Sequence, residues 1–340
     1  MPALDGIEEI IQTTCGIIAT VLNLFLLHLI INKSPPKFGV YKYLMIYTSV
    51  LEIAYAIVDM LLTPHLFSYR SAYLVIVDSN KTILPSWIIF YFNIFYSVAF
   101  GMAIGIFDIH FVFRYLVVTG KTSWTSKSPL KLLIWIAIPL ICGLLASVVC
   151  HVFLGPNELM NSYIRNDLAN FLQVSMQYDY YVGFYIYPTD SNGLQVVNWW
   201  NIIGLVLTSL ILGTTSFVMF FFGIKCYKAI SSFTSKTSNI SMQSQSVQTQ
   251  LFYALVVQTV IPMAFMQLPA LVLFAFCFAD SAFEAIGRFL SVTIAMYPAI
   301  NPLPNMFIIT DYRRAIMGLF SKQPKRSSQV DTVASMTMAL

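Results

Sequence analysis

The chain has 340 residues, of which 58% are hydrophobic and only 10% are charged. Soluble domains carry about 25% charged residues, so long apolar segments must hold most of the hydrophobic side chains here. The net charge of +4 is too small to indicate a nucleic-acid partner, and the five cysteines form no CxxC pair that would indicate a disulfide framework or a zinc cluster. The composition therefore predicts an integral membrane protein.

Seven apolar segments follow one another along the chain. A helix needs about 20 apolar residues to cross the hydrocarbon core of a bilayer. The segments that meet this requirement, or nearly so, are Ile10–Ile31, Tyr43–Thr63, Trp87–Phe113, Leu132–Leu154, Trp199–Phe222, Leu251–Cys277 and Phe289–Ile309. They are too long for membrane strands and do not alternate apolar with polar residues. We therefore expect an all-α membrane protein, a bundle of seven transmembrane helices.

The basic residues orient this bundle, because Lys and Arg near the ends of spans stay on the cytoplasmic side. Fifteen of the 19 Lys and Arg residues fall in connections that share one side with the C-terminus. The exceptions are Arg70, Lys81, Arg165 and Arg288. The sequence thus predicts an extracellular N-terminus (residues 1–9), a membrane domain (10–309) and a cytoplasmic tail (310–340) of a plasma-membrane protein. A sequon at Asn80 lies on the predicted outer side and is expected to be glycosylated.

Three polar residues fall at similar depth in the first, second and seventh predicted spans. Counted from the cytoplasmic ends at 1.5 Å per residue, Asn23, Glu52 and Asn301 each lie roughly 12–14 Å into the membrane. Polar side chains are costly there, so this arrangement predicts a buried polar network, in which Glu52 holds a proton or a cation. A simple hydrogen bond between helices explains each residue equally well on its own. Asp59, two turns further out, faces either a ligand cavity or water.

The cytoplasmic end of the third predicted span carries His110, Arg114 and Tyr115. An arginine there either extends to the membrane interface or acts as a latch that releases a partner when the helices rearrange. Pro262 in the sixth span and Pro302 in the seventh are expected to kink their helices, because proline removes a backbone hydrogen bond. With Asn301, these residues are the candidates for activation at the inner end of the bundle.

The connections and the tail add three expectations. The outer connection 155–198 is long and rich in tyrosine, and we expect it to form a lid over the mouth of the bundle. The inner connection Ser231–Thr249 has ten Ser or Thr among its 19 residues, which predicts a mobile linker that is either inert or phosphorylated. Residues 311–320 combine basic and apolar side chains, which predicts a short amphipathic helix on the inner lipid leaflet.

Several classes of function lack their characteristic residues. The sequence has no HExxH, GxSxG or phosphate-binding glycine motif, so neither an enzyme nor a cofactor is expected. The four histidines lie in different segments without metal-ligand spacing, so no metal site is expected. The predicted spans carry few polar residues for a channel or transporter.

Four segments together resemble a known family in their order and spacing: Gly39–Met45, His110–Tyr115, Gln250–Pro262, and Tyr297–Pro302 continuing to Asp311–Arg314. They are similar to the nematode serpentine chemoreceptors of the Str type, and the likeness runs from about residue 10 to 320. The resemblance implies a receptor in the ciliary membrane of a chemosensory neuron that detects small molecules and signals through a heterotrimeric G protein. Arg114 and Tyr115 stand where rhodopsin-like receptors keep an Asp-Arg-Tyr latch, although His110 and aromatic residues replace the acid.

The expected ligand site lies in the outer halves of the central spans. Its candidates are Asp59, Asn93, Tyr96, Ser97, Trp200, Asn201, Phe265 and Gln267. Ordinary packing between helices, or an interfacial belt in the case of Trp200, is the alternative explanation for each. The expected partners are a small-molecule ligand, a heterotrimeric G protein and membrane lipids, with arrestin and kinases acting on the inner loop and tail. A seven-span ligand-gated cation channel and a non-signalling membrane protein remain alternatives.

Overall fold

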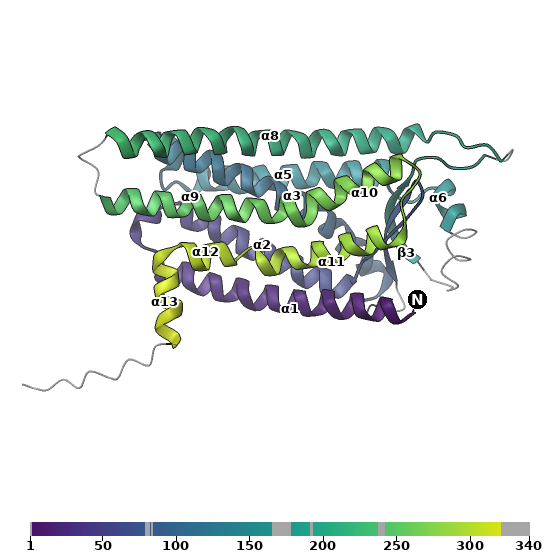
Figure 1. Cartoon of the computed structure of the whole chain (residues 1–340), viewed down its shortest axis with the longest axis horizontal. Coiled ribbons are helices and arrows are strands. Elements are labelled where there is room, and N and C mark those ends of the chain that lie inside the picture. The colour runs from purple at the N-terminus through teal and green to yellow at the C-terminus, as the bar shows by residue number, and fades with distance from the viewer. Residues whose placement is uncertain are drawn as a thin grey trace, which may run out of the picture.

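The structure is a computed structural model and describes residues 2–78, 82, 84–164, 178–190, 193–236 and 242–320. Long helices run side by side as an elongated bundle (Figure 1). One end, which we call the sheet end, carries a small β-sheet and the N-terminus. The other end, which we call the tail end, carries the last described helix, α13 (Thr310–Phe320), which turns away from the bundle axis.

Seven spans are built from these helices. Five are single helices: α1 (Pro2–Lys33), α2 (Tyr41–Leu62), α3 (Ser86–Val118), α5 (Pro129–Phe153) and α8 (Trp199–Lys236). The sixth span is the series α9 (Met242–Pro262), a π-helical turn η3 (Met263–Gln267) and α10 (Leu268–Phe278), and the seventh is α11 (Glu284–Ile300) with α12 (Leu303–Ile308). Six of the spans are long and apolar enough to cross a membrane, and the seventh qualifies as a bent pair with α13, at an angle of 97°. The predicted seven-helix bundle is thus confirmed.

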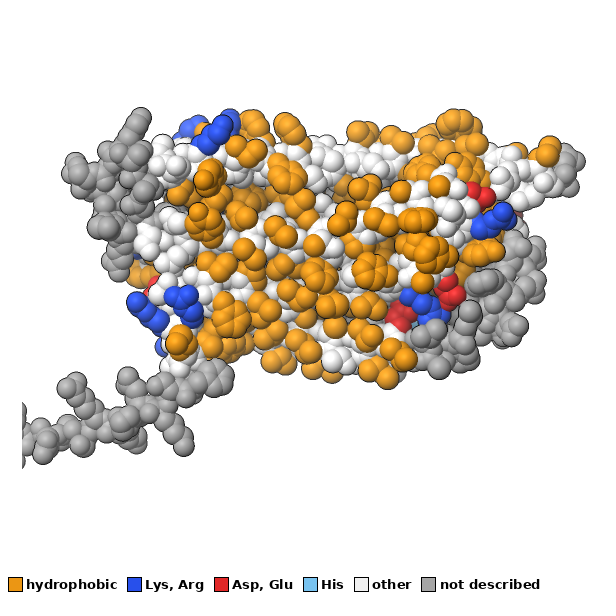
Figure 2. All heavy atoms as spheres, viewed as in Figure 1, with side chains coloured by type: hydrophobic (Ala, Val, Ile, Leu, Met, Phe, Trp, Pro, Cys, Tyr) orange, Lys and Arg blue, Asp and Glu red, His pale blue; other side chains and the backbone are white. Residues whose placement is uncertain are grey.

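The surface of the bundle is apolar where a bilayer would surround it. Hydrophobic side chains cover the middle of the face shown in Figure 2, and charged side chains lie toward its two ends. Many large apolar residues of the helices are strongly exposed; Phe217 on α8, for example, is 67% exposed. Contiguous apolar surface of this kind would be unfavourable in water and is matched by lipid. The folded surface therefore agrees with the membrane prediction from composition.

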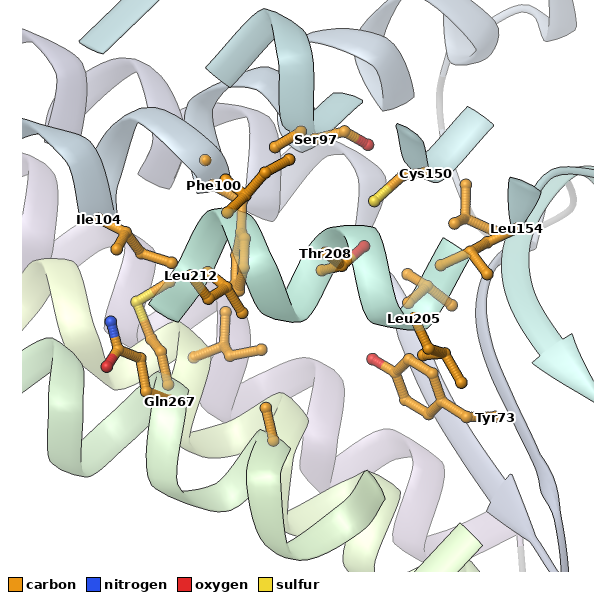
Figure 3. Close-up of a pocket in the computed structure, with 18 of the residues that line it drawn as sticks. Tyr73, Ser97, Phe100, Ile104, Cys150, Leu154, Leu205, Thr208, Leu212 and Gln267 are labelled. Atoms are coloured by element: carbon orange, nitrogen blue, oxygen red, sulfur yellow. The ribbon is translucent and has the colours of Figure 1, made fainter. Parts of the chain in front are cut away.

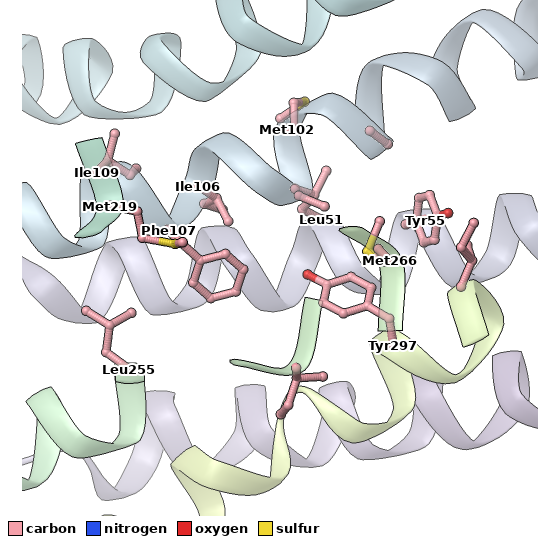
Figure 4. Close-up of a cluster of buried hydrophobic side chains, with 14 of the residues drawn as sticks. Leu51, Tyr55, Met102, Ile106, Phe107, Ile109, Met219, Leu255, Met266 and Tyr297 are labelled. Atoms are coloured by element: carbon pink, nitrogen blue, oxygen red, sulfur yellow. The ribbon is translucent and has the colours of Figure 1, made fainter. Parts of the chain in front are cut away.

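The interior of the bundle is packed with aromatic and aliphatic side chains. Figure 4 shows one part of this core, where Tyr55, Phe107 and Tyr297 are among the side chains that fill the space between the spans. α3 and α5 approach closely where Gly143 faces the α3 backbone. A Cβ atom added at Gly143 would lie 2.4 Å from the Val98 carbonyl oxygen, so only glycine permits this contact.

The helical fold also contains a small β-sheet at the sheet end, which the sequence did not predict. Strands β1 (His65–Tyr69), β2 (Ala72–Asp78) and β3 (Tyr178–Tyr185) form an antiparallel sheet in the order β1-β2-β3. The segments are rich in β-branched and aromatic residues, which favour strands, but they lie between spans and are too short to stand out in a search for membrane helices. A tight turn joins β1 to β2, with Arg70 in the left-handed region at a φ of 52°.

Both faces of this sheet are covered. On one face, a cluster of buried side chains that includes Leu74 and Tyr181 packs against the short helix α6 (Glu158–Tyr163). The Tyr181 hydroxyl donates to Asn161 Oδ1 of α6 at 2.6 Å. The other face closes the sheet end of the helix bundle. The sheet therefore forms a two-layered cap with α6.

The first helix is docked into the bundle near its start. The Gln12 amide donates to the Pro64 carbonyl at 3.0 Å and to the Ser291 hydroxyl at 2.7 Å. Glu8 is buried and lies 3.9 Å from the Arg288 guanidinium of α11. The helix begins at Pro2, so the boundary drawn at residue 10 from the sequence falls inside α1.

The connection between the fifth and sixth spans is more helical than expected. α8 continues to Lys236 and α9 begins at Met242, so much of the segment predicted to be a mobile linker is helical. The remaining short helices are η1 (Pro36–Phe38) and α4 (Thr122–Thr125), both in connections. The sequon residue Asn80 and the tail beyond residue 320 lie outside the described residues.

Candidate functional site

A cavity of about 180 Å³ lies beneath the sheet, inside the bundle. Its walls come from α3, α5, α8, the π-helical turn, α10 and α11, and its roof comes from the three strands (Figure 3). Apolar side chains such as Phe100, Leu205 and Leu212 make up most of the lining. An apolar cavity of about 150 Å³ is known to hold benzene, so this one suits a molecule of roughly six to ten non-hydrogen atoms.

Four of the eight residues proposed from the sequence as ligand contacts line this cavity. They are Asn93, Tyr96, Ser97 and Gln267. The Asn93 amide donates to the Ile89 carbonyl at 3.2 Å, and the Ser97 hydroxyl donates to the Asn93 carbonyl at 3.0 Å. Gln267 closes the π-helical turn of the sixth span, a type of irregularity that is frequent at functional sites.

The structure places the other four candidates elsewhere. Trp200 is 54% exposed on the bundle surface, and its indole nitrogen donates to the Val152 carbonyl. Asn201 is buried and links α8 to α5 and β3: its amide donates to the Phe153 carbonyl, and its oxygen accepts from the Tyr185 backbone N–H. Phe265 is partly buried against the main core. Asp59 is buried and hydrogen-bonded to Tyr96, next to the cavity lining rather than in it.

The roof of the cavity contains functional candidates that the sequence did not reveal. Tyr73 on β2, Phe184 on β3 and Phe274 on α10 all line the cavity and form a mutual aromatic cluster. Their ring centroids lie 5.6 Å apart for Tyr73 and Phe184, 5.5 Å for Phe184 and Phe274, and 6.5 Å for Tyr73 and Phe274. This cluster ties the sheet to the part of the sixth span at the sheet end. Part of the predicted lid segment, β3, thus lies over the cavity.

Strands β2 and β3 of the roof lie close together because β3 has a glycine at the point of contact. Gly183 of β3 faces Leu74 of β2, and a Cβ atom there would lie 2.3 Å from the Tyr73 carbonyl oxygen. No side chain fits in that space. Substitution at Gly183 would therefore displace Tyr73 and the roof.

The three polar residues predicted at one depth come together in the middle of the bundle. The Asn301 amide donates to Glu52 Oε1, and the Tyr297 hydroxyl lies 3.5 Å from the same oxygen. The Asn23 amide donates to the Pro298 carbonyl at 3.0 Å, which links the first span to the seventh. All three residues are at most 3% exposed. A buried polar group without partners is costly, so this network holds the first, second and seventh spans in one arrangement.

The sixth span is attached to the same network. The Gln258 amide of α9 donates to the Asn301 carbonyl oxygen at 3.1 Å. That carbonyl is at the break between α11 and α12, where Pro302 has no backbone N–H to donate. Pro262 ends α9 and is followed directly by the π-helical turn. The two prolines predicted to kink the helices therefore lie at irregular points of the sixth and seventh spans.

A second polar cluster lies at the tail end, around Arg114 of α3. The Arg114 side chain is 1% exposed, its Nη1 donates to Gln248 Oε1 of α9 at 2.6 Å, and its guanidinium lies 3.5 Å from the centre of the Tyr41 ring. His110 is also buried, between the Tyr41 hydroxyl at 3.0 Å and the Thr48 hydroxyl at 2.9 Å. The cluster thus joins α2, α3 and α9, and the arginine does not extend to the interface.

Two further contacts complete the tail end. The Gln250 side chain of α9 accepts a hydrogen bond from the Thr310 backbone N–H, at the start of α13, at 2.9 Å. Tyr115 is partly exposed and packs edge-on against Phe222 of α8, with ring centroids 5.6 Å apart. The part of the sixth span at the tail end therefore contacts both the third span and α13. Among the residues that the structure describes, no group of His, Cys, Asp or Glu side chains is arranged to hold a metal ion.

The comparison with known protein families agrees with this architecture. Residues 8–317 match the model of the family described as "Serpentine type 7TM GPCR chemoreceptor Str". The chain belongs to this family. The Str family is one of receptors rather than enzymes, and its members are membrane proteins with several spans.

The similarity to individual relatives extends over nearly the whole of this chain. The G-protein coupled receptor str-217 of Caenorhabditis elegans is 30% identical over 309 residues, which are 91% of this chain and 88% of the relative. The serpentine receptor class r-10 of Caenorhabditis briggsae is 29% identical over 323 residues, which are 94% of this chain and 91% of the relative. The crystal structure of squid rhodopsin shares the fold, with a TM-score of 0.64 at 13% identity, and the match covers 94% of this chain and 86% of that one.

Proposed function

We propose that this Str-family chain detects a small uncharged molecule in the cavity beneath the sheet and activates a heterotrimeric G protein at its tail end. The observation that carries the proposal is the position of the cavity. It contacts the sixth span through Met266, Gln267, Ala270 and Phe274, and the same span reaches Arg114 at the opposite end through Gln248. A ligand that favours one position of this span therefore has a direct way to bias the tail end.

The chemistry of the lining supports an uncharged ligand. No Asp, Glu, Lys or Arg is among the described residues that line the cavity. An ion placed there would lose its hydration without gaining a partner of opposite charge, which costs several kcal/mol. A neutral molecule that is mostly apolar gains by leaving water instead.

Release at the tail end is the proposed response. Arg114 and Gln248 hold the third and sixth spans together in the present arrangement, and separating them would open a cleft bounded by Arg114, Tyr115 and Tyr41. The predicted orientation puts this end in the cytoplasm, where a G protein would bind, and the sheet outside. We further propose that the receptor acts in the plasma membrane of a sensory cilium, and that kinases and arrestin act on the Ser- and Thr-rich connection 231–249 and the tail.

The test is a G-protein dissociation reporter in cells that display an N-terminally tagged receptor. A chemically broad panel of small neutral compounds is applied to the wild type, to Arg114→Ala and to Lys33→Ala, a control at an exposed cation of the same end. We expect a compound that activates the wild type and Lys33→Ala but not Arg114→Ala. A compound that binds the receptor and leaves every G-protein class undissociated would contradict the proposal.

A further inference from the structure

Most polar side chains of the cavity lining have their hydrogen bonds satisfied within the protein. The Ser97 hydroxyl donates to the Asn93 carbonyl, and the Thr215 hydroxyl donates to the Leu212 carbonyl at 3.0 Å. Tyr96 is hydrogen-bonded to Asp59. The Thr208 hydroxyl has no partner within the described structure, but its oxygen is fully buried and presents no open surface. None of these groups is free to meet a ligand without a rearrangement.

Tyr73 and Gln267 differ from the rest of the lining. Both side chains border the cavity, and neither hydrogen-bonds to another residue in the part of the chain that the structure describes. Burial raises the pKa of the Tyr73 hydroxyl well above its ordinary value, so the phenol stays neutral and can donate or accept. The Gln267 amide offers both a donor and an acceptor. Each group is therefore an uncharged hydrogen-bonding site that faces an otherwise apolar space.

The two groups lie at opposite ends of the cavity. Figure 3 shows Gln267 at one end, near Ile104, and Tyr73 at the other, near Leu205 and Leu154. The sixth span explains the distance between Gln267 and Tyr73. Gln267 ends the π-helical turn and Phe274 lies seven residues further along, in α10, which is about 10 Å along a helix. The Phe274 ring packs edge-on against the Tyr73 ring. Apolar side chains such as Phe100 and Leu212 line the space between them.

We propose that the cavity binds an elongated, uncharged molecule with a hydrogen-bonding group at each end, one held by Tyr73 and the other by Gln267. A molecule with a single polar group leaves one of the two side chains desolvated without a partner, and a hydrocarbon leaves both. The cavity thus selects for two oxygens or nitrogens separated by an apolar chain. This inference rests on the proposed function only in taking the cavity as the ligand site.

The probes that test it are octane, octan-2-one and octane-2,7-dione, which share a chain length and differ in the number of carbonyl groups. Binding is measured with the purified full-length receptor in lipid nanodiscs, as the rise in melting temperature with probe concentration. For the wild type we expect the dione to bind about 2- to 12-fold more tightly than the monoketone, the range for one hydrogen bond between uncharged groups.

Two variants test whether Tyr73 and Gln267 each bind one polar group of the ligand. Tyr73→Phe keeps the aromatic cluster and removes the hydroxyl, and Gln267→Leu keeps the approximate volume and removes the amide. Each is expected to lower the affinity for the dione by about the same 2- to 12-fold. Octane, which leaves both polar side chains without a partner in the wild type, is expected to bind each variant at least as tightly, which also shows that the variant is folded. Thr214→Val is the control on α8: its hydroxyl is already bonded to the Leu210 carbonyl, and Thr214 is not among the lining residues, so this variant is expected to bind all three probes as the wild type does.

Two results would overturn the inference. One is equal affinity of the wild type for the monoketone and the dione, and the other is the absence of stabilisation by any of the three probes. Both can be distinguished from a failure of the proposed function, which is read from G-protein dissociation with the broad panel. A receptor that responds to some other compound while ignoring the dione would keep its function and lose the proposed ligand class.

Discussion

Replacing Gln248 with alanine removes the one hydrogen bond found between Arg114 and the sixth span in the described structure. The bond has a charged donor and is short, at 2.6 Å, and the arginine is 1% exposed. The guanidinium otherwise lies on the Tyr41 ring of α2. If the contact with Gln248 keeps the bundle closed, we expect the alanine variant to signal without ligand.

The size of the effect follows from the type of bond. Hydrogen bonds to charged groups contribute about 1.5–3 kcal/mol, which corresponds to about a 10- to 100-fold change in the equilibrium between closed and open forms. Minor conformations are commonly populated at about 0.1–10%. Starting from about 1% open, the variant would reach about 10–50% open, and basal signalling would rise in proportion.

The assay is G-protein dissociation without added compound, normalised to receptor at the surface of unpermeabilised cells. Gln248→Glu is the matched variant, because a carboxylate strengthens the bond to Arg114 and should lower basal signalling. Arg114→Ala also removes this bond, but it should abolish signalling with either residue at position 248, because Arg114 bounds the proposed G-protein cleft as well. The reasoning is refuted if Gln248→Ala has wild-type basal activity at equal surface level, or if Gln248→Glu raises it.

Three further predictions concern the fold. Gly143→Ala should lower the melting temperature of the purified receptor by several degrees, because the new methyl group meets the Val98 carbonyl at 2.4 Å, whereas Gly213→Ala, with nothing within 4 Å, should be neutral or slightly stabilising. Glu52→Gln should be tolerated, since an amide can still accept from Asn301, but Glu52→Leu should reduce both surface display and melting temperature. An N-terminal epitope should be stained in unpermeabilised cells; staining only after permeabilisation would reverse the predicted orientation and favour the channel alternative.

The spans and the mid-membrane network were the parts of the structure most open to prediction. Length and apolarity alone define a transmembrane helix, because an unbonded backbone cannot lie in hydrocarbon. Depth follows from counting residues along a helix, and the count by itself places Asn23, Glu52 and Asn301 at one level. That Asn301 donates to Glu52 is the physical consequence of three polar residues sharing that level.

The direction in which a side chain points around its helix was much harder to predict. In α8 polar residues lie on both faces: Thr208 and Thr215 line the cavity, whereas Ser209 and Thr214 are exposed, so polarity alone does not distinguish the face toward lipid from the face toward the interior. Trp200 and Asn201 are neighbours at the same depth, yet one lies on the surface and the other is buried. Both candidates lie at the start of α8, and the rotation of the helix decides which of them faces the interior.

Tyr73 and Gln248 were missed for another reason, since each lies in a segment that was taken to be a connection. Tyr73 sits in a short strand whose partner, β3, is about 100 residues further along the chain, and such distant pairing leaves no local signal. Gln248 belongs to a segment rich in serine and threonine, a composition typical of mobile linkers. α9 extends through this segment and turns Gln248 toward Arg114.

The sixth span connects the two sites that this receptor is proposed to couple, with Phe274 against Tyr73 at one end and Gln248 against Arg114 at the other. Coupling between binding and conformation is reciprocal: a ligand that opens the tail end must bind more tightly to a receptor that is already open. Gln248→Ala should therefore raise the affinity for an activating ligand, up to the factor by which it raises basal activity. An increase in basal signalling without any gain in affinity would mean that the cavity and the Arg114 cluster are not coupled through this span.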